Sequence, residues 1–289
     1  MDTRRTEPVG QVFDSWRVVD GEVRCIDRHR ARFAAAVSEA FGPRAVAAEE
    51  IDELFAVAAA RTPDAGEWFP RVKALRSAGS SDVAGPVELS FELRPAPMPR
   101  ATTRLRTARD PRRHPAIKGA DAEALAQLRE EALAADADDA LFLDGGGAIL
   151  EAANGAVIAW RDGTILLPDV HAGTVLPSTT VSLIVELAAA DRIPIARGAL
   201  LPQGEDELWY VNGLHTVSPV VAIDGVERRF DAARADAWRA RIDARRKPWA
   251  TGAAVDSTAQ VDVRAAGAPA DGISASDGVA ETNGGAPAR

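Results

Sequence analysis

Residues 141–168 read LFLDGGGAILEAANGAVIAWRDGTILLP. The apolar run LFLD predicts a strand, and the three glycines that follow it are typical of a tight turn. Two further apolar runs, AVIAW and TILL, are separated by Arg-Asp-Gly, which predicts a pair of strands. Glu151 lies between the glycine turn and this pair. The stretch therefore predicts short strands in close succession, with one carboxylate at a turn.

Helical and strand patterns alternate on both sides of this stretch. Between residues 27 and 42, Phe33, Val37 and Phe41 recur every four positions, Asp27 is placed to cap a helix, and Gly42 is placed to end it. Further helices are expected at about 47–60, 121–135, 179–190 and 231–246, an Asp-Gly hairpin at 13–24, and strands at 87–95 and 208–225. The mixture indicates an α/β or α+β protein of two lobes.

The expected boundaries are a smaller N-terminal α/β lobe at 1–108 and a larger C-terminal lobe at 109–249. Residues 250–289 have no aromatic residue and are rich in Ala, Gly, Ser and Asp. Such a segment buries too little apolar surface to offset the entropy of ordering, so a disordered tail is expected there.

Composition restricts the class of protein. The formal net charge of −9 and the pI near 5.1 argue against nucleic acid as the partner. The single Cys25 excludes an internal disulfide. The sequence also lacks the Cys/His cluster that would indicate a metal site. The sequence contains no signal-like or membrane-spanning apolar run. We therefore expect a soluble, cytoplasmic protein that binds neither metal nor membrane.

Lysine is rare in this chain, and one lysine stands close to the opening stretch. Of the 34 basic residues, only Lys73, Lys118 and Lys247 are lysines. A partly desolvated lysine amine loses its proton and attacks carbonyl groups, whereas a guanidinium does not. Genomic composition alone is a sufficient reason for the rarity, so the case for Lys118 depends on its surroundings.

Four stretches in a fixed order supply those surroundings. They are IKG at Lys118, D-x-x-G-x-x-x-E ending at Glu151, L-P-x-x-T at 176–180, and N-x-L-x-x-V-x-P-V at 212–220. Upstream, His29, Arg32 and Phe33 form H-x-x-R-F. Together they resemble the class IV pyridoxal-phosphate enzymes: branched-chain and D-amino-acid aminotransferases and 4-amino-4-deoxychorismate lyase. The resemblance covers about residues 13–245.

The resemblance implies a role for each matching residue. The fold would be the two-lobed fold type IV, with pyridoxal 5'-phosphate in the cleft between the lobes. Lys118 would form a Schiff base with the cofactor and move the substrate proton, and Glu151 would contact the pyridine nitrogen. Arg32 would bind the cofactor phosphate. The backbone amides of the phosphate cup would come from Thr179, Thr180, Gly213 and Leu214.

Several departures from the family leave the reaction open. Ala156 stands where many members have asparagine, and Ser178 and Val181 replace the glycine and arginine of the usual phosphate turn. An aminotransferase is expected first. A lyase releasing pyruvate and 4-aminobenzoate is the alternative, since NGLHTVSPV resembles the lyase turn, and a non-catalytic relative is the third reading.

Less is implied about substrate and assembly. Arg94 and His215 are the candidate contacts for substrate, which would be an amino acid with its oxo acid, or aminodeoxychorismate. A homodimer is expected, as is usual in the family.

Overall fold

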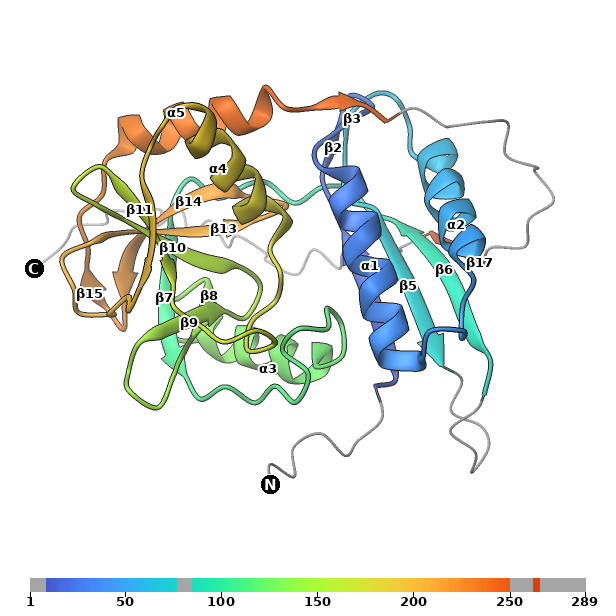
Figure 1. Ribbon diagram of the computed structural model, residues 1–289, viewed down its shortest axis with the longest axis horizontal. Helices are drawn as coiled ribbons and strands as arrows, with labels where there is room; N and C mark the ends of the chain where they lie inside the picture. Colours follow the sequence, from blue (N-terminus) through green and yellow to red (C-terminus); the bar gives the residue numbers. More distant parts are fainter. Residues whose placement is uncertain (1–8, 77–84, 250–261, 266–289) are drawn as a thin grey trace, which may run out of the picture.

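The computed structural model describes residues 9–76, 85–249 and 262–265. Two lobes lie side by side (Figure 1). One contains a four-stranded sheet with the first two helices, and the other contains a curled nine-stranded sheet with the remaining three. None of the described helices is long and apolar enough to cross a membrane.

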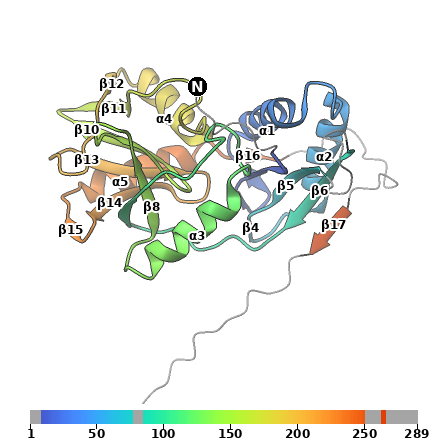
Figure 2. The ribbon, with the colours of Figure 1, turned by 90° about the horizontal axis from the view of Figure 1, so that it is seen from below.

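The N-terminal lobe is a sheet covered on one face by two helices (Figure 2). The sheet order is β1-β5-β6-β17, and the strands are β1 (Gln11–Ser15), β5 (Arg71–Arg76), β6 (Val87–Leu93) and β17 (Asp262–Ala265). The helices are α1 (Ile26–Phe41) and α2 (Ala48–Arg61), close to the expected ranges. Phe33, Val37 and Phe41 are buried, as their spacing predicted.

The Asp-Gly hairpin is confirmed. β2 (Val18–Val19) pairs with β3 (Glu22–Val23), and Asp20 and Gly21 between them have φ of 47° and 73°, as a tight hairpin turn requires. β4 (Glu67–Trp68) and β16 (Lys247–Pro248) complete this small sheet. Because β16 follows the last helix, the hairpin ties the end of the C-terminal lobe to the N-terminal lobe.

The expectation for the start of α1 was wrong. Cys25, in a left-handed conformation with φ 53°, is the N-cap, and it makes no side-chain cap. Asp27 lies inside the first turn, where a carboxylate still interacts favourably with the positive end of the helix dipole. Gly42 does end the helix, with φ 100°.

The larger sheet has the order β12-β11-β10-β13-β14-β7-β8-β9, with β15 beside β14. Its strands are β7 (Thr103–Ala108), β8 (Asp139–Leu143), β9 (Ile149–Ala152), β10 (Ala156–Arg161), β11 (Thr164–Pro168), β12 (Ile195–Gly198), β13 (Glu207–Asn212), β14 (Thr216–Ile223) and β15 (Val226–Glu227). The helices are α3 (Ala122–Leu133), α4 (Thr179–Ala190) and α5 (Ala232–Asp243). The strand pair predicted from AVIAW and TILL is β10 with β11.

Two groups of tryptophans mark the two cores. Trp160, Trp209 and Trp238 lie with ring centroids 5.4 to 6.1 Å apart, between the large sheet and helices α4 and α5. In the N-terminal lobe, Trp16 stacks on Phe55 at 5.0 Å and meets Trp249 edge-on at 5.3 Å. Each lobe therefore has a hydrophobic core of its own.

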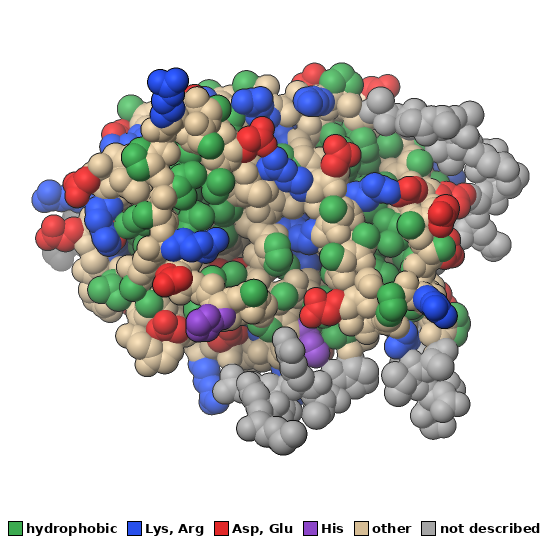
Figure 3. All heavy atoms as spheres, viewed as in Figure 1, with side chains coloured by type: hydrophobic (Ala, Val, Ile, Leu, Met, Phe, Trp, Pro, Cys, Tyr) green, Lys and Arg blue, Asp and Glu red, His purple; other side chains and the backbone are tan. Residues whose placement is uncertain are grey.

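The lobe boundary differs from the expected one by a strand. β7, which falls before residue 108, pairs in parallel with β14 and β8 of the larger sheet. A local pattern cannot show this, because the partners of β7 lie far along the chain. In the expected tail, residues 262–265 form β17 in parallel with β6, and the rest of that expectation lies outside the described residues. On the face seen in Figure 3, acidic and basic side chains are interspersed.

Candidate active site

Lys118 lies where the two lobes meet, in the loop between β7 and α3. Its carbonyl oxygen accepts a hydrogen bond of 2.9 Å from the backbone N–H of Phe13 on β1. The next residue, Gly119, has φ of +102°, and a Cβ there would stand 2.6 Å from Cδ1 of Phe13 and 2.8 Å from its nitrogen. Only glycine permits this approach. The Lys118 backbone is thus held against the N-terminal lobe, with Nζ 5.3 Å from the Phe13 ring centroid.

The Lys118 amine is in a setting that favours its neutral form. Burial, reinforced by the positive charges of Arg32 and Arg71, lowers the pKa of Lys118 to about 8, while the carboxylates of Asp14 and Glu151 act in the opposite direction. The residue as a whole is half-buried. A neutral amine has the lone pair that attack on a carbonyl carbon needs.

Glu151 lies on β9, only 5% exposed. Its Oε1 accepts hydrogen bonds from the Arg112 guanidinium and, at 3.1 Å, from the backbone N–H of Leu176. Both donors bind the same oxygen, so within the described chain Oε2 is left for a further donor. Burial raises the pKa of Glu151 to about 7, against the opposing effect of Arg112.

Arg112 is the partner of Glu151 that the sequence analysis missed. It is buried, its guanidinium binds Asp110 at 2.7 and 2.8 Å, and it lies 4.7 Å from the centre of the Phe142 ring. Arg112 stands 39 positions before Glu151, and nothing in the local pattern around either residue indicates the pairing.

Arg32, on α1, is held by a buried carboxylate. Asp14 is fully buried and binds Arg32 through both oxygens, each at 2.8 Å, and Nη1 of Arg32 donates to the carbonyl of Pro177 at 2.9 Å. Although burial alone would raise the pKa of Asp14, Arg32 and His29 hold it well below its usual range. These contacts use three of the five N–H groups of Arg32. Nη2 also lies 3.4 Å from Nδ1 of His29, but that nitrogen donates to Asp14, so two N–H groups of Arg32 are left for a ligand.

Thr179 and Thr180 begin α4, but neither caps it. Ser178 is the N-cap, and its hydroxyl accepts the N–H of Val181 at 3.2 Å. The amides of Thr179 and Thr180 are the first two of the helix, which have no partner inside it and therefore favour an anion. Ser178 has φ of −83°, so serine in place of glycine causes no backbone strain here.

His29 connects α1 to the start of α4. Its Nδ1 lies 2.9 Å from Asp14 Oδ1, and its Nε2 lies 3.3 Å from the Thr179 hydroxyl. Burial lowers the pKa of His29, so the ring is neutral near pH 7. With Nδ1–H donating to Asp14, the free lone pair of Nε2 accepts the hydroxyl proton of Thr179. Asp14 and His29 therefore tie the N-terminal lobe to the first residue of α4 through the Thr179 hydroxyl.

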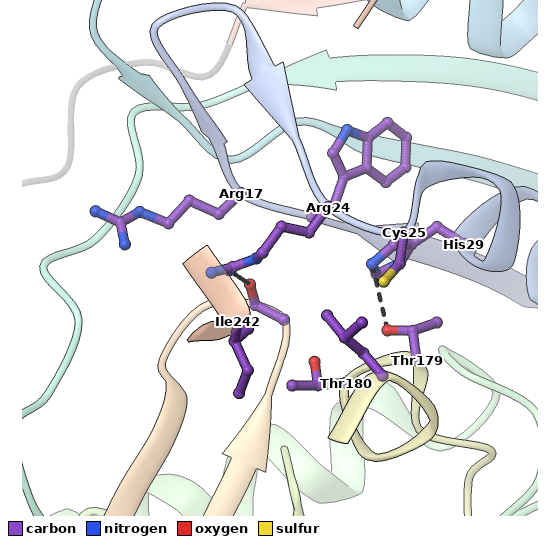
Figure 4. A pocket seen from close by; sticks show the side chains of 10 residues that line it. Arg17, Arg24, Cys25, His29, Thr179, Thr180 and Ile242 are labelled. Atoms are coloured by element: carbon purple, nitrogen blue, oxygen red, sulfur yellow. Dashed lines mark hydrogen bonds between the residues drawn. The ribbon is translucent and has the colours of Figure 1, made fainter. Parts of the chain in front are cut away.

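Gly213 shares a pocket with Thr179 and Thr180 at the junction of the lobes (Figure 4). The other lining residues are Trp16, Arg17, Arg24, Cys25, His29, Leu183 and Ile242. Two donors here, Nε1 of Trp16 and Nε of Arg17, are buried without an acceptor in the described chain. Leu214 differs from its expected role, because its N–H donates to Oδ1 of Asn212 at 3.1 Å. In this arrangement the turn offers Gly213, not Leu214, to an anion.

The two substrate candidates, Arg94 and His215, have different hydrogen-bond partners. Arg94 donates to the Ser15 hydroxyl at 3.2 Å, and Arg71 approaches the same oxygen at 3.4 Å. Arg71 also lies 4.6 Å from the Phe13 ring centroid, the ring that Lys118 approaches. The Nε of Arg94 is buried without a partner in the described chain, and burial, with Arg71 beside it, lowers its pKa to about 10.

His215 stands in the turn after β13 with 8% exposure. Its Nδ1 accepts the backbone N–H of Arg100 at 3.0 Å, so a neutral ring carries its proton on Nε2. Burial, followed by the charges of Arg100, Arg129 and Arg17, lowers the pKa of His215 to about 3. His215 is thus a neutral donor rather than a cation near pH 7.

Comparison with known proteins gives one family match. The model of the family described as amino-transferase class IV matches residues 11–223. None of the curated proteins matches this chain.

Solved structures with this fold are distant in sequence. A fold IV transaminase from Curtobacterium pusillum is 23% identical with a TM-score of 0.71, covering 82% of this chain and 84% of its own. A branched-chain aminotransferase from Thermoproteus uzoniensis, solved with norvaline, is 16% identical with a TM-score of 0.71, covering 86% and 96%. A hypothetical aminotransferase from Mycobacterium tuberculosis in its PLP-bound form is 20% identical with a TM-score of 0.69, covering 82% and 88%. At these identities the likeness shows a shared two-lobed fold.

Proposed function

The chain belongs to the amino-transferase class IV family, and from this premise we propose that it transfers an amino group between an amino acid and a 2-oxo acid through Lys118. Family membership makes the chain an enzyme and its cofactor pyridoxal 5'-phosphate, and this disfavours the non-catalytic reading. The observation that carries the proposal is the Lys118 amine, with its pKa near 8, at the junction of the lobes.

The residues present fit this cofactor. The free amides at the start of α4, with two unused N–H groups on Arg32, suit a phosphate, and Oε2 of Glu151 suits a protonated ring nitrogen. When bound, the cofactor supplies an aldehyde that the Lys118 amine attacks and a ring that withdraws electrons from the substrate α-carbon.

The remaining steps fall to this chain's own side chains. Lys118 Nζ would take the proton from the substrate α-carbon and deliver it to the cofactor carbon that had carried the aldehyde. Glu151 holds a proton on the ring nitrogen, and Arg112 keeps the carboxylate oriented for that task. Arg32, Thr179, Thr180 and Gly213 hold the phosphate, while Asp14 keeps Arg32 in place. In this proposal Leu214 helps to shape the turn and does not donate its N–H to the phosphate.

We assign the substrate carboxylate to the two arginines at Ser15. Arg71 and Arg94 converge on one hydroxyl group, and the Nε–H of Arg94 has no acceptor in the described chain. Arginine binds carboxylates with two parallel hydrogen bonds, and the Phe13 ring brings this pair next to Lys118. His215, as a neutral Nε2–H donor, is a second contact for a polar group of the substrate.

The lyase is the second candidate, because of the turn at residues 212–216. Its Asn212 and Leu214 match the N-x-L of the lyases, and Asn212 has a defined role there, accepting the amides of Leu214 and His215 at 3.1 and 2.8 Å. The homodimer stays a prediction from the family resemblance, and the cytoplasmic location stays a prediction from the composition.

Two assays on the purified protein decide between these reactions. An aminotransferase converts its bound cofactor to the pyridoxamine form when mixed with one of a panel of L- and D-amino acids, and 2-oxo acids reverse the change. A lyase releases pyruvate and 4-aminobenzoate from aminodeoxychorismate. Turnover of aminodeoxychorismate without amino-acid half-reactions would replace the first candidate by the second.

Replacing Lys118 by alanine is expected to abolish both activities and the absorbance band that borohydride removes, because the amine that would bind the cofactor aldehyde is lost. Lys247→Ala is the matched control, since this lysine is exposed on β16. It is expected to keep full activity. A Lys118→Ala protein that turns over normally would contradict the assignment.

A further inference from the structure

The turn between β13 and β14 holds a strained residue. Thr216 has φ of +60°, in the left-handed region that a β-branched side chain rarely adopts. It is 4% exposed, and its hydroxyl donates to the carbonyl of His215 at 2.6 Å. Such a conformation persists only where surrounding contacts fix it, and residues of this kind cluster at functional sites.

Contacts from three directions fix this turn. Oδ1 of Asn212 accepts the amides of Leu214 and His215. The carbonyl of Gly213 accepts Nη2 of Arg24 at 3.1 Å, and Nδ1 of His215 accepts the backbone N–H of Arg100. Of these partners, Asn212 is the one within the turn that orients two successive amides, so its own orientation decides the shape of the turn.

Asn212 is in turn oriented by Tyr210, the chain's only tyrosine. Nδ2 of Asn212 donates to the Tyr210 hydroxyl at 3.1 Å and to the carbonyl of Asn154 at 3.0 Å. The Tyr210 hydroxyl donates to Oδ2 of Asp139 at 2.9 Å, and both residues are 1% exposed. The side-chain amide of Asn154 also donates to Asp139, at 3.1 Å.

The Tyr210 ring is held in position by close packing against Gly155. A Cβ on Gly155 would stand 2.6 Å from Cζ of Tyr210, so the ring packs directly on a glycine backbone. Asp139, at the other end of the chain of contacts, also accepts the backbone N–H groups of Ala140 and Asn154 at 3.0 and 2.9 Å. A buried carboxylate held in this way is a rigid acceptor. It fixes the Tyr210 hydroxyl, and that hydroxyl in turn orients the Asn212 side chain.

We propose that Tyr210 is a positioning residue for cofactor phosphate. Through Asn212 it fixes the strained turn so that Gly213 stays on the pocket that it shares with Thr179 and Thr180. The inference rests on the phosphate cup of the proposed function. Without the hydroxyl, Asn212 keeps only the Asn154 carbonyl as acceptor for Nδ2, and the strain at Thr216 is released by movement of the turn.

The test compares two ligands that differ by the phosphate. Cofactor-free wild type and Tyr210→Phe are titrated with pyridoxal 5'-phosphate and with pyridoxal, and the dissociation constants are measured by absorbance. Loss of one buried hydrogen bond predicts about tenfold weaker binding of pyridoxal phosphate by the variant, with pyridoxal binding unchanged. A merely structural role would lower both affinities together or neither, and either result would overturn the proposal.

Thr103→Val is the matched control. The Thr103 hydroxyl lies 2.7 Å from that of Ser218, both are fully buried, and Ser218 pairs with Tyr210 in the sheet. The variant removes a buried hydroxyl from the same sheet without touching the turn. It is expected to lower the melting temperature and leave the ratio of the two affinities as in wild type. A fall in this ratio equal to that of Tyr210→Phe would count against a specific role for Tyr210.

Asn212→Ala and the double variant test the route of the effect. If Tyr210 acts through Asn212, Asn212→Ala loses at least as much phosphate preference as Tyr210→Phe, and the double variant loses no more than Asn212→Ala. Additive losses would overturn that route. Wild type that binds both ligands equally would refute the phosphate cup itself, a result distinct from failure of Tyr210 alone.

Discussion

At the scale of single residues, burial and neighbouring charges set the pKa of Lys118. Burial is the largest influence on its pKa, and the two arginines, Arg32 and Arg71, act in the same direction. Arg32 is itself neutralised by Asp14, whereas Arg71 lies 3.8 Å from Glu92, a looser contact. Arg71 is therefore the residue whose charge can be removed to test the setting of the amine.

The pKa of Lys118 predicts a pH dependence. Attachment of pyridoxal phosphate to cofactor-free protein is expected to accelerate as pH rises through about 8, because only the neutral amine attacks. In Arg71→Gln the loss of a positive charge raises the pKa, so the midpoint of the rate profile moves to higher pH, by roughly half a unit to one unit. Stopped-flow absorbance at a series of pH values measures both profiles.

Arg161→Gln is the control for this experiment. Arg161 is exposed and pairs with Asp206 on the C-terminal lobe. Its removal is expected to leave the midpoint where it is in wild type. A wild-type midpoint near 10.4, the ordinary value for lysine, would show that the amine is not desolvated.

At the scale of elements, the approach of the Lys118 loop to β1 depends on Gly119. The glycine combines a left-handed conformation with a close contact to the Phe13 backbone, so two separate penalties fall on any replacement. Among the described residues, this loop and β1 are joined by the backbone hydrogen bond that the Phe13 N–H donates to the Lys118 carbonyl. The position of the Lys118 backbone thus depends on one residue without a side chain.

Gly119→Ala is expected to destabilise the protein by about 2 kcal/mol or more, and to weaken activity further by moving Lys118. Urea denaturation measures the first effect. Gly145→Ala is the matched control, since a Cβ there meets nothing within 4 Å. It is expected to change the free energy of unfolding by less than about 1 kcal/mol. Equal losses in the two variants would contradict the contact argument.

The sequence predicted elements better than their arrangement. The range 179–190 expected for α4 is the observed one, because Pro177 and Ser178 mark its start and the apolar run gives its period. The pairing of β7 with β14 joins segments more than a hundred positions apart, and no local pattern encodes it. The hairpin at Asp20 was predictable because its turn and both of its strands are contiguous in the sequence.

The same distinction applies to the candidate site. Lys118, Glu151 and Arg32 stand in motifs and were proposed from the sequence. Arg71 and Arg112 were not, because their roles come from partners in other strands. Asp14 carried a weak signal, a carboxylate on an otherwise apolar strand face, but its partner Arg32 lies on the following helix.

At the scale of the whole molecule, the candidate cofactor residues are divided between the lobes. Arg32 belongs to the N-terminal lobe, and Glu151, Thr179 and Gly213 belong to the C-terminal lobe. The direct links between the lobes include Arg32 with Pro177 and His29 with Thr179. A cofactor bound to both sets of residues therefore adds to the links that hold the lobes together.

This division predicts that pyridoxal phosphate stabilises both lobes together. At a free concentration of about 100 times the dissociation constant, the free energy of unfolding is expected to rise by about 2.7 kcal/mol. Differential scanning calorimetry with and without cofactor measures the change. Two transitions, of which only one moves on addition of the cofactor, would show that the ligand is held by a single lobe.

The tryptophans add an optical consequence to this division. Trp160, Trp209 and Trp238 are packed in the C-terminal core, whereas Trp16 lines the interlobe pocket and contacts Trp249. A cofactor that absorbs in the near ultraviolet accepts energy most efficiently from the nearest indoles. The emission of Trp16, which lines the pocket with Thr179, Thr180 and Gly213, is therefore a built-in gauge of occupancy.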